Sequence, residues 1–340
     1  MVERVDMSDQ HWPERTAEYP LECDHCHYPI PGDPVASDDG RYCSVACREA
    51  DDNTTLPDPQ AYKRVVTGVE PIDSLVPNGI PADSFLLLSG DEGTSRAELG
   101  IELVWRALER GEPAVVVSLA NPPTATLERF YQNGWNVLPA LENDRLRIID
   151  CYTHRLDDRD GFRAQRTEWP TFLGEAAADA IVEVRDPSDR SEVTHSLTGA
   201  LDDLEMSETG LVTIDSLDEL ERVFQDRQVH EFVEEIRATV CKARFVPIVA
   251  AASTADEDDI PEAEYVFDGI VDLRLTEQRA PNTRHKQLAI RKLIGAQFLP
   301  QWIQYDHEPA RGLFAASPNT GRSTQQGYEV GTELSQPDRP

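Results

Sequence analysis

The sequence predicts an α/β fold, a mostly parallel sheet flanked by helices, from three observations. Five short apolar runs show no alternation, which is typical of strands buried on both faces of a parallel sheet. These runs are 84–89, 114–119, 146–150, 211–215 and 245–250. Helical patterns separate them, and strands that alternate with helices indicate a doubly wound domain. Three later runs predict an antiparallel extension of the sheet, and they are 270–275, 287–293 and 302–305.

The clearest predicted helix covers residues 96–110, shortly after the first strand. Its apolar residues recur at helical spacing and form one face suited to burial. They are Leu99, Leu103, Val104, Ala107 and Leu108. Gly111 stands where a glycine in the left-handed conformation commonly ends a helix, so we expect the helix to stop there.

Composition divides the chain into segments around this α/β domain. We expect a disordered N-terminus, a cysteine-rich module, a Pro/Asp-rich linker, the α/β domain and a disordered polar tail. Their bounds are 1–20, 21–50, 51–63, 64–315 and 316–340. Residues 153–203 are charged and weakly patterned, and we treat them as an insertion without an assigned structure.

The charge of the chain is strongly negative, with 63 Asp and Glu against 32 Lys and Arg, a net charge of −31. Attraction to nucleic acid through bulk charge needs clustered cations, so this balance excludes it and disfavours an anionic membrane surface. The acids are spread along the chain, and only four of the basic residues are lysines. Such a chain is tolerated where molar salt shortens the Debye length to about 3 Å, so we expect a halophile, such as a haloarchaeon.

Two further absences in the sequence bear on location. No run reaches the ~20 apolar residues that a membrane helix needs. Residues 1–20 carry charges and lack the apolar core of a signal peptide. We therefore expect a cytoplasmic protein without a membrane partner.

Four of the six cysteines form two close pairs, Cys23-x2-Cys26 and Cys43-x3-Cys47. Two pairs of thiolates at this spacing predict a closed tetrahedral zinc site with a structural role, and incidental reduced thiols are the alternative. A segment this short and polar has little core, so bound metal would supply most of its folding free energy. The segment ECDHC…YCSVAC resembles the treble-clef zinc modules called TRASH-like, and we expect this module to bind other proteins.

The loop between the first strand and the helix stands where a Walker A motif would lie. A working G-x4-G-K-[ST] loop binds phosphates through its backbone, its lysine and a metal-binding hydroxyl. Here the last three positions hold Ser95, Arg96 and Ala97. Arginine keeps the charge in a different geometry, alanine binds no metal, and Asp91 and Glu92 add negative charge. The sequence therefore predicts a degenerate phosphate loop.

A second element supports descent from a nucleotide site. The strand at 211–215 ends in Asp215, the pattern of a Walker B element, although a strand-terminal Asp also commonly caps a turn. The candidate nucleotide-binding residues, vestigial or weak, are Gly90, Gly93, Thr94, Ser95, Arg96 and Asp215.

Residues 67–119, from TGVEPID to AVVVSL, resemble the start of the RecA-superfamily ATPases related to KaiC and RadA. The resemblance continues through 145–150, the strand ending in Asp215 and the C-terminal strands. It implies a RecA-like P-loop NTPase fold over 64–315, with ATP and Mg²⁺ as the family's ligands and ring or dimer contacts between copies.

The chain departs from that family where the chemistry would occur. The family usually carries an acidic pair after the strand corresponding to 114–119, and one Glu acts as the base for the attacking water. This chain has Ala120, Asn121 and Pro122 there, and none of these accepts a proton at neutral pH. The base is lost together with the phosphate-binding lysine and the metal-binding hydroxyl, so we expect the fold without ATP hydrolysis.

Two other groups of residues deserve interpretation. Cys151 and Cys241 fall at the ends of a strand and a helix, and we expect them to pack in the core. The basic cluster consists of Arg284, Lys286, Arg291 and Lys292. The resemblance implies contact with a neighbouring subunit's nucleotide, and a charged sheet edge that resists aggregation is the alternative.

The leading interpretation is a regulatory or adaptor protein that acts through protein contacts. An ATP-binding switch, in which Arg96 replaces the lysine and Asp215 holds Mg²⁺ through water, stays open. A transcription-linked regulator that acts through a partner also stays open, as does a homo-oligomer. Zinc is the expected cofactor, and ATP with Mg²⁺ is left undecided.

Overall fold

The protein is described here by a computed structural model. It describes residues 21–25, 30, 33–36, 40–51, 63–156, 168–224, 226–253, 264–277 and 284–316. Contacts within the chain divide it into two units, residues 1–63 and 64–340, which are treated separately below. The predicted N-terminal segment, residues 52–62 of the linker and the tail beyond Ala316 lie outside the described residues. No helix among the described residues is both long and apolar enough to cross a membrane.

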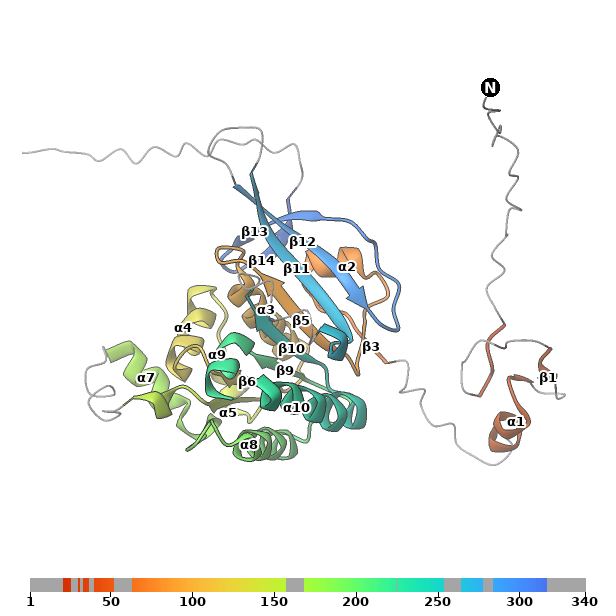
Figure 1. Ribbon diagram of the computed structural model, residues 1–340, viewed down its shortest axis with the longest axis horizontal. Helices are drawn as coiled ribbons and strands as arrows, with labels where there is room; N and C mark the ends of the chain where they lie inside the picture. The colour runs from red at the N-terminus through yellow and green to blue at the C-terminus, as the bar shows by residue number, and fades with distance from the viewer. Residues whose placement is uncertain are drawn as a thin grey trace, which may run out of the picture. The chain divides into compact units, whose positions relative to one another are not determined.

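The first unit contains a small hairpin and one helix. Strand β1 (Val35–Ala36) pairs antiparallel with β2 (Arg41–Tyr42), and helix α1 (Val45–Asp51) follows directly (Figure 1). Its described core is small: Cys23, Ile30 and Tyr42 are buried. The described residues of this unit therefore bury few apolar side chains to balance the entropy of ordering them.

The second unit is built on a ten-stranded sheet in the order β14-β13-β12-β11-β5-β10-β9-β6-β7-β8 (Figure 1). Strands β5 to β11 are parallel, and β12, β13 and β14 extend the sheet antiparallel, as predicted. The strands are β5 (Phe85–Gly90), β6 (Ala114–Ser118), β7 (Leu146–Asp150), β8 (Ile181–Glu183), β9 (Leu211–Ile214), β10 (Ile248–Ala252), β11 (Gly269–Glu277), β12 (Arg284–Leu293), β13 (Ile303–Glu308) and β14 (Gly312–Ala315). A separate pair, β3 (Arg64–Val65) and β4 (Ile80–Pro81), precedes β5.

Helices cover both faces of the sheet, which explains why the strand sequences do not alternate. On β5, Leu86 and Leu88 join one core, whereas Phe85 and Leu87 join the other. The helices of the first core are α2 (Glu70–Leu75), α3 (Arg96–Glu109), α4 (Pro123–Gln132), α5 (Leu138–Glu142) and α7 (Glu168–Ala176). Those of the second core are α8 (Arg190–Asp203), α9 (Leu217–Val223) and α10 (Asp226–Ile236), which continues into the short π-helix η4 (Arg237–Lys242). Short 3₁₀ turns are η2 (Thr153–Arg155), η3 (Ala178–Ala180) and η5 (Glu264–Val266).

Helix α3 ends as its sequence predicts. Gly111 has φ +81°, and its N–H donates to Leu108 O at 3.0 Å. The N–H of Glu112 donates to Ala107 O at 3.0 Å, which completes a Schellman motif. The helix that follows the phosphate-loop segment therefore has a fixed length and a fixed end.

Strand β10 differs from its predicted range of 245–250, because it covers Ile248–Ala252. Phe245 has φ +54° and its N–H still bonds the carbonyl of Cys241 at the end of η4. A residue in the left-handed conformation followed closely by Pro247 cannot continue a regular strand. Residues 245–247 therefore belong to the loop between η4 and β10, although they are apolar.

The described part of residues 153–203 belongs to the sheet and its helices. Strand β8 forms one edge of the sheet beside β7. Helix α8 buries Val193, Leu197 and Leu201 against the second core. An Asx cap, in which Asp189 accepts from Ser191 N at 2.9 Å, with Glu192 three residues after Asp189, was the local signal that could have located this helix.

Candidate nucleotide site and cysteine cluster

The loop between β5 and α3 has the backbone form of a phosphate loop. Strand β5 ends at Gly90 and α3 begins at Arg96. Gly93 has φ +84° and Ser95 has φ +60°, so both residues are left-handed. Ser95 holds a conformation that favours glycine, at an order-of-magnitude cost of about 1 kcal/mol. The turn is therefore kept although the second glycine of the motif is replaced.

The side chain of Arg96 folds back onto its own loop. Its Nη1 donates to Gly90 O at 2.9 Å, and its Nη2 lies 3.8 Å from Asp218 Oδ2. Burial lowers the pKa of the Arg96 guanidinium, and the charges of Asp218, Glu92 and Asp91 oppose this shift. The cation in the lysine position of the motif is thus engaged by groups of this chain.

Two residues of the C-terminal strands contact the same loop. Lys286 on β12 donates from Nζ to Ser95 Oγ at 2.7 Å. The hydroxyl of Tyr305 on β13 donates to Thr94 O, and Thr94 is fully buried. The sequence singled out Lys286 only as a member of a basic cluster and Tyr305 only as the end of a strand, because each contact spans about 200 residues. No local pattern marks such a contact.

Asp215 lies directly after β9, beside the end of β6. Its Oδ1 accepts from Leu119 N at 2.8 Å and Ala120 N at 3.1 Å, and its Oδ2 also accepts from Ala120 N at 3.1 Å. Burial raises the pKa of Asp215 to about 6, although the two backbone hydrogen bonds act in the opposite direction. The carboxylate therefore holds the turn after β6.

That turn contains the residues at which the resemblance described above predicts an acidic pair. Ala120, Asn121 and Pro122 connect β6 to α4, which begins at Pro123. Ser118 Oγ donates to Asn121 O at 2.9 Å and fixes the turn from within. None of the residues from Ala120 to Pro122 carries a carboxylate, so a water molecule beside the loop meets no base from this turn.

The basic cluster lies on β12, between β11 and β13 in the strand order. Strand β13 pairs with β12 at Lys286, Gln287 and Leu288, so Lys286 does not lie at an open sheet edge. For Arg284, Arg291 and Lys292 the interpretation as a charged edge stays a prediction. Their surroundings differ: Arg291 Nε lies 2.8 Å from Asp272 Oδ2, Lys292 Nζ lies 3.5 Å from Tyr265 O, and Lys286 reaches the loop.

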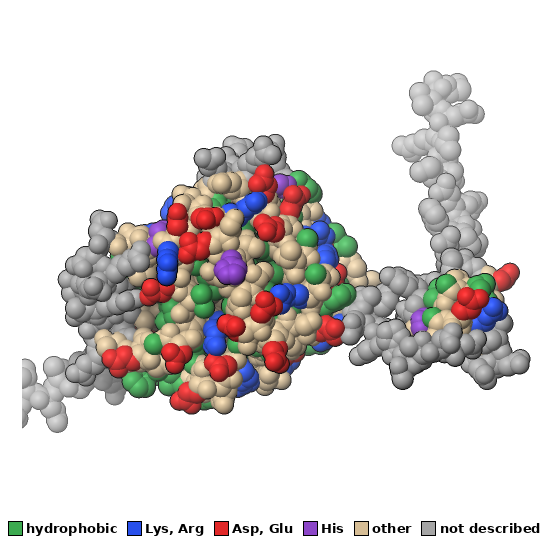
Figure 2. Space-filling model, turned by 90° about the horizontal axis from the view of Figure 1, so that it is seen from below, with side chains coloured by type: hydrophobic (Ala, Val, Ile, Leu, Met, Phe, Trp, Pro, Cys, Tyr) green, Lys and Arg blue, Asp and Glu red, His purple; other side chains and the backbone are tan. Residues whose placement is uncertain are grey.

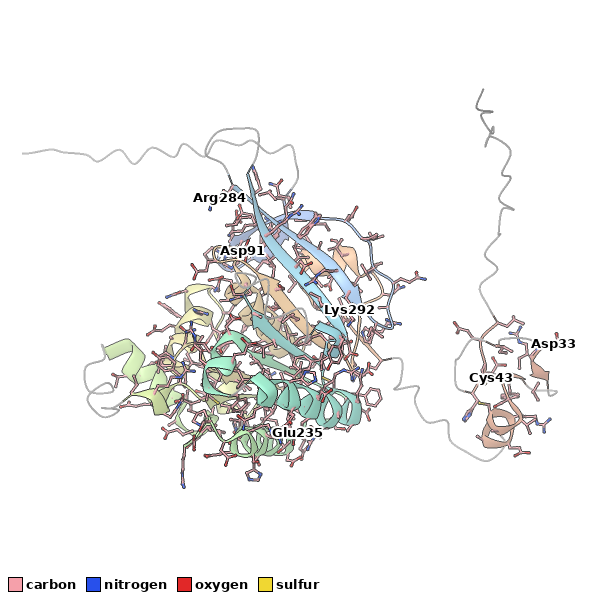
Figure 3. All side chains as sticks on the ribbon, in the orientation of Figure 1. Asp33, Cys43, Asp91, Glu235, Arg284 and Lys292 are labelled. Atoms are coloured by element: carbon pink, nitrogen blue, oxygen red, sulfur yellow. The ribbon has the colours of Figure 1, made fainter. Side chains whose placement is uncertain are left out.

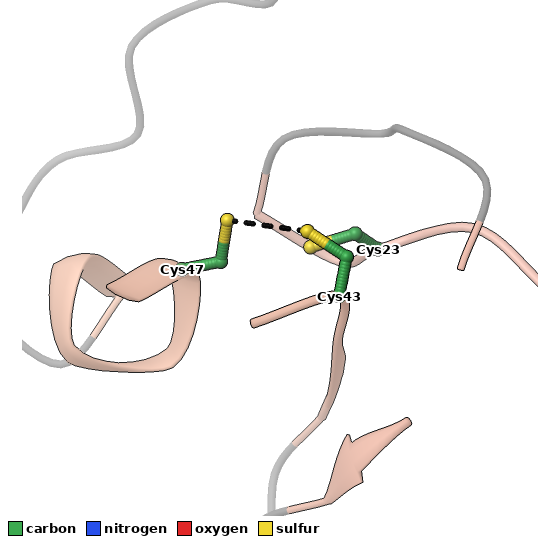
Figure 4. Close-up of side chains that lie close together, drawn as sticks. All are labelled: Cys23, Cys43 and Cys47. Atoms are coloured by element: carbon green, nitrogen blue, oxygen red, sulfur yellow. Dashed lines mark hydrogen bonds between the residues drawn. The ribbon is translucent and has the colours of Figure 1, made fainter. Parts of the chain in front are cut away.

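The first unit brings three predicted ligands together. Sγ atoms of Cys23, Cys43 and Cys47 all lie within 4.8 Å of one another, and those of Cys43 and Cys47 are 3.6 Å apart (Figure 4). Tetrahedral zinc with Zn–S bonds of about 2.3 Å requires Sγ–Sγ distances of about 3.8 Å. The spacing of these thiols therefore fits a zinc ion. Cys26, the fourth predicted ligand, lies outside the described residues.

Cys151 and Cys241 pack as expected. Both are buried in the second core, and burial raises the pKa of each thiol far above its ordinary value. Such thiols are inert as nucleophiles and metal ligands.

The mostly parallel sheet, the phosphate-loop turn between β5 and α3 and the acid after β9 define a domain of the RecA-like fold class. A family model described as "ATPase: KaiC" matches residues 65–312. The chain belongs to this KaiC ATPase family.

The similar proteins agree with this assignment. A UPF0273 protein of Methanopyrus kandleri is 28% identical over 220 residues, which is 64% of this chain and 79% of the relative. A UPF0273 protein of Methanocaldococcus jannaschii is 26% identical over 216 residues, 63% of this chain and 81% of the relative. The crystal structure of a KaiC-like protein from Pyrococcus horikoshii covers 75% of this chain and 100% of its own, with a TM-score of 0.57 at 16% identity. At that identity the last similarity concerns the fold alone.

Proposed function

We propose that this chain is a regulatory or adaptor member of the KaiC family that does not hydrolyse ATP and acts through protein contacts. The observation that carries the proposal is the turn after β6, where Asp215 binds the N–H groups of Leu119 and Ala120. The strand-terminal acid stabilises a turn that offers no base. Activation of water for phosphoryl transfer needs such a base or a positioned polar group.

The experiment is an assay of ATP hydrolysis in molar KCl with Mg²⁺. We expect no phosphate release above the background of buffer alone, because the turn 120–122 lacks a proton acceptor. Turnover that scales with protein concentration and disappears in Arg96→Ala would contradict the proposal. It would support the ATP-driven switch instead, in which Arg96 serves as the cation of the loop.

We assign these protein contacts to the first unit, which would be a small module stabilised by zinc. Three thiols at zinc spacing and a very small core support this assignment. A closed site of four thiolates leaves no open coordination position, so its role would be structural. The residues that would hold the ion are Cys23, Cys26, Cys43 and Cys47.

Zinc content tests this assignment directly. Protein purified without chelators is expected to contain about one zinc ion per chain by elemental analysis. Cys43→Ser and Cys47→Ser are expected to lose the metal, because each removes a thiolate from the cluster. Cys241→Ala, which changes a buried thiol of the other unit, serves as the control and should keep it. Equal zinc in Cys43→Ser and the control would contradict the site.

We further propose that the protein works in the cytosol of a salt-accumulating archaeon. Figure 2 shows acidic side chains scattered over one face of the second unit, between basic and uncharged ones, as the sequence composition suggests. A dispersed acidic surface self-repels in dilute buffer and is screened at molar salt.

A further inference from the structure

We propose that Lys286 of β12 is the cation that contacts the phosphates of a nucleotide at this loop, in place of the helix residue Arg96. The inference rests on the proposed function, since it concerns binding at a loop that does not hydrolyse. It assigns the phosphate-binding charge to the same chain that provides the loop, but from a strand about 190 residues away.

Lys286 reaches the loop together with residues of the two strands beside β12. On β11, Leu275 lies opposite Lys286, and its Cδ1 is 3.4 Å from where a Cβ on Gly93 would lie. On β13, Tyr305 lies opposite Lys286 and bonds the carbonyl of Thr94. Side chains of β12 and β13 therefore bond Ser95 and Thr94, and a side chain of β11 lies near Gly93. The ammonium is held at the N-terminal end of α3, where backbone N–H groups favour an anion.

Among the described residues, Lys286 forms no ion pair. Among the described residues no carboxylate lies within 4.0 Å of its Nζ, and its hydrogen-bond partner is the neutral hydroxyl of Ser95. Lys242, by contrast, lies 2.8 Å from Asp83 and 3.3 Å from Asp268. In a chain of net charge −31, a half-buried ammonium that forms no ion pair with a described carboxylate is a position suited to a bound anion.

Arg96 is less suited to this role. Its guanidinium already donates to Gly90 O and lies near Asp218. To reach a phosphate, the guanidinium of Arg96 would have to give up its contacts with Gly90 O and Asp218. An ammonium has three donors, so Lys286 can keep its bond to Ser95 and still bind phosphate oxygens.

The chain offers a matched control on the same strand. Figure 3 shows Arg284 and Lys292 at opposite ends of β12, with Asp91 of the loop near the Arg284 end. Lys286, two residues after Arg284, contacts Ser95 of the loop, whereas Lys292 contacts the carbonyl of Tyr265. Replacing either lysine removes one positive charge from β12, but only one of them touches the loop.

The test is the affinity for ATP with Mg²⁺, measured by calorimetry in molar KCl on the full chain. Lys286→Met is expected to raise the Kd at least about tenfold, the effect of losing one charge-assisted hydrogen bond. Lys292→Met should leave the Kd within about twofold. Lys286→Gln, which keeps a donor for Ser95 without the charge, should behave like Lys286→Met, and Lys286→Arg should retain most of the affinity.

Four results of the affinity measurements would overturn the inference. Equal weakening in Lys286→Met and Lys292→Met would indicate a bulk charge effect. Full affinity in Lys286→Gln would mean that Lys286 only braces Ser95. Loss of affinity in Arg96→Met with normal affinity in Lys286→Met would assign the phosphates to Arg96. Absence of ATP binding by the unmodified chain would remove the site and leave the proposed non-hydrolytic function intact, whereas ATP hydrolysis would remove that function and leave the role of Lys286 to the same affinity measurements.

Discussion

Asp268→Ala is expected to lower the free energy of unfolding by about 3–5 kcal/mol, the cost of breaking a buried ion pair by removing one partner. Asp268 is only 2% exposed and stands just before β11. It accepts from Phe85 N at 3.0 Å and from Arg237 Nε and Nη2 at 3.1 and 2.7 Å, and Lys242 Nζ lies at 3.3 Å. Alanine would leave the backbone N–H of Phe85 and the guanidinium of Arg237 without this acceptor, while Lys242 would keep its contact with Asp83.

The measurement is urea unfolding in molar KCl, with Asp272→Ala as the control. Asp272 lies on β11 and pairs with Arg291 nearer the surface, so its loss should cost less than about 1 kcal/mol. A similar loss of stability in both variants would contradict a special role for Asp268.

The pH dependence of Asp268 has a definite sign. Burial alone would raise the pKa of this carboxyl, but hydrogen bonds from Arg237 and Phe85 N hold it below the ordinary 3.8. A carboxyl with a depressed folded-state pKa stabilises the fold above its unfolded value. Its contribution is therefore complete at neutral pH and is lost as the pH falls below about 3.8, a loss that Asp268→Ala should not show.

Glu102→Ala is expected to have the second large effect, again about 3–5 kcal/mol in the free energy of unfolding. Glu102 lies in the middle of α3 and is fully buried. Its Oε2 accepts from Leu313 N at 2.7 Å and its Oε1 from Arg106 Nη2 at 3.0 Å, so it joins the helix after the phosphate loop to β14. A Cβ on Gly312 would lie 2.1 Å from Glu102 Oε1, which explains the glycine there.

Urea unfolding of Glu102→Ala, Glu102→Gln and Glu109→Ala separates the contributions. Glu109 pairs with Arg106 on the same helix but is 43% exposed, so its removal should cost under about 1 kcal/mol. Glu102→Gln keeps an acceptor for Leu313 N–H and should lie between the two. If Glu102→Ala is no more destabilising than Glu109→Ala, the buried link does not hold β14.

The pH dependence of Glu102 has the opposite sign to that of Asp268. Burial raises the pKa of Glu102 above the ordinary 4.5, against the hydrogen bonds from Leu313 N–H and Arg106. A raised folded-state pKa means that protonation favours the folded state, a contribution that is full below 4.5 and lost as the pH rises through the folded value. Wild type should therefore gain stability relative to Glu102→Gln as the pH falls from neutrality toward 4.5.

Elements with strong local patterns were predictable from the sequence. The apolar runs of β5, β6, β7 and β9 are long and uninterrupted, because both faces of a parallel strand are buried. Gly111 marked the end of α3 through its freedom to adopt positive φ. The three-residue strand β8 and the helices beside it carry too few apolar residues for this signal. The predicted range of β10 began too early, because its apolar run includes Pro247 and Phe245, which has a left-handed backbone.

Parts of the candidate sites were also predictable from the sequence, and other parts depended on folding. The thiol cluster and the altered phosphate loop were visible as spacing, since Cys43 and Cys47, like Gly90 to Arg96, are neighbours along the chain. Cys23 joins the pair only through folding of the hairpin, but the expected module already implied it.

The sequence by itself determined the fold class and which residues stand in the loop 90–97 and in the turn 120–122, since all of these are local features. Only the tertiary structure decided which charges meet. Sheet order brings β12 beside β11 and β11 beside β5, so Lys286 reaches Ser95, and it brings β9 beside β6, so Asp215 binds Ala120 N–H. The physical reason is that periodicity records which face of an element is buried, whereas the partner of a buried charge depends on pairings between strands that are distant in sequence.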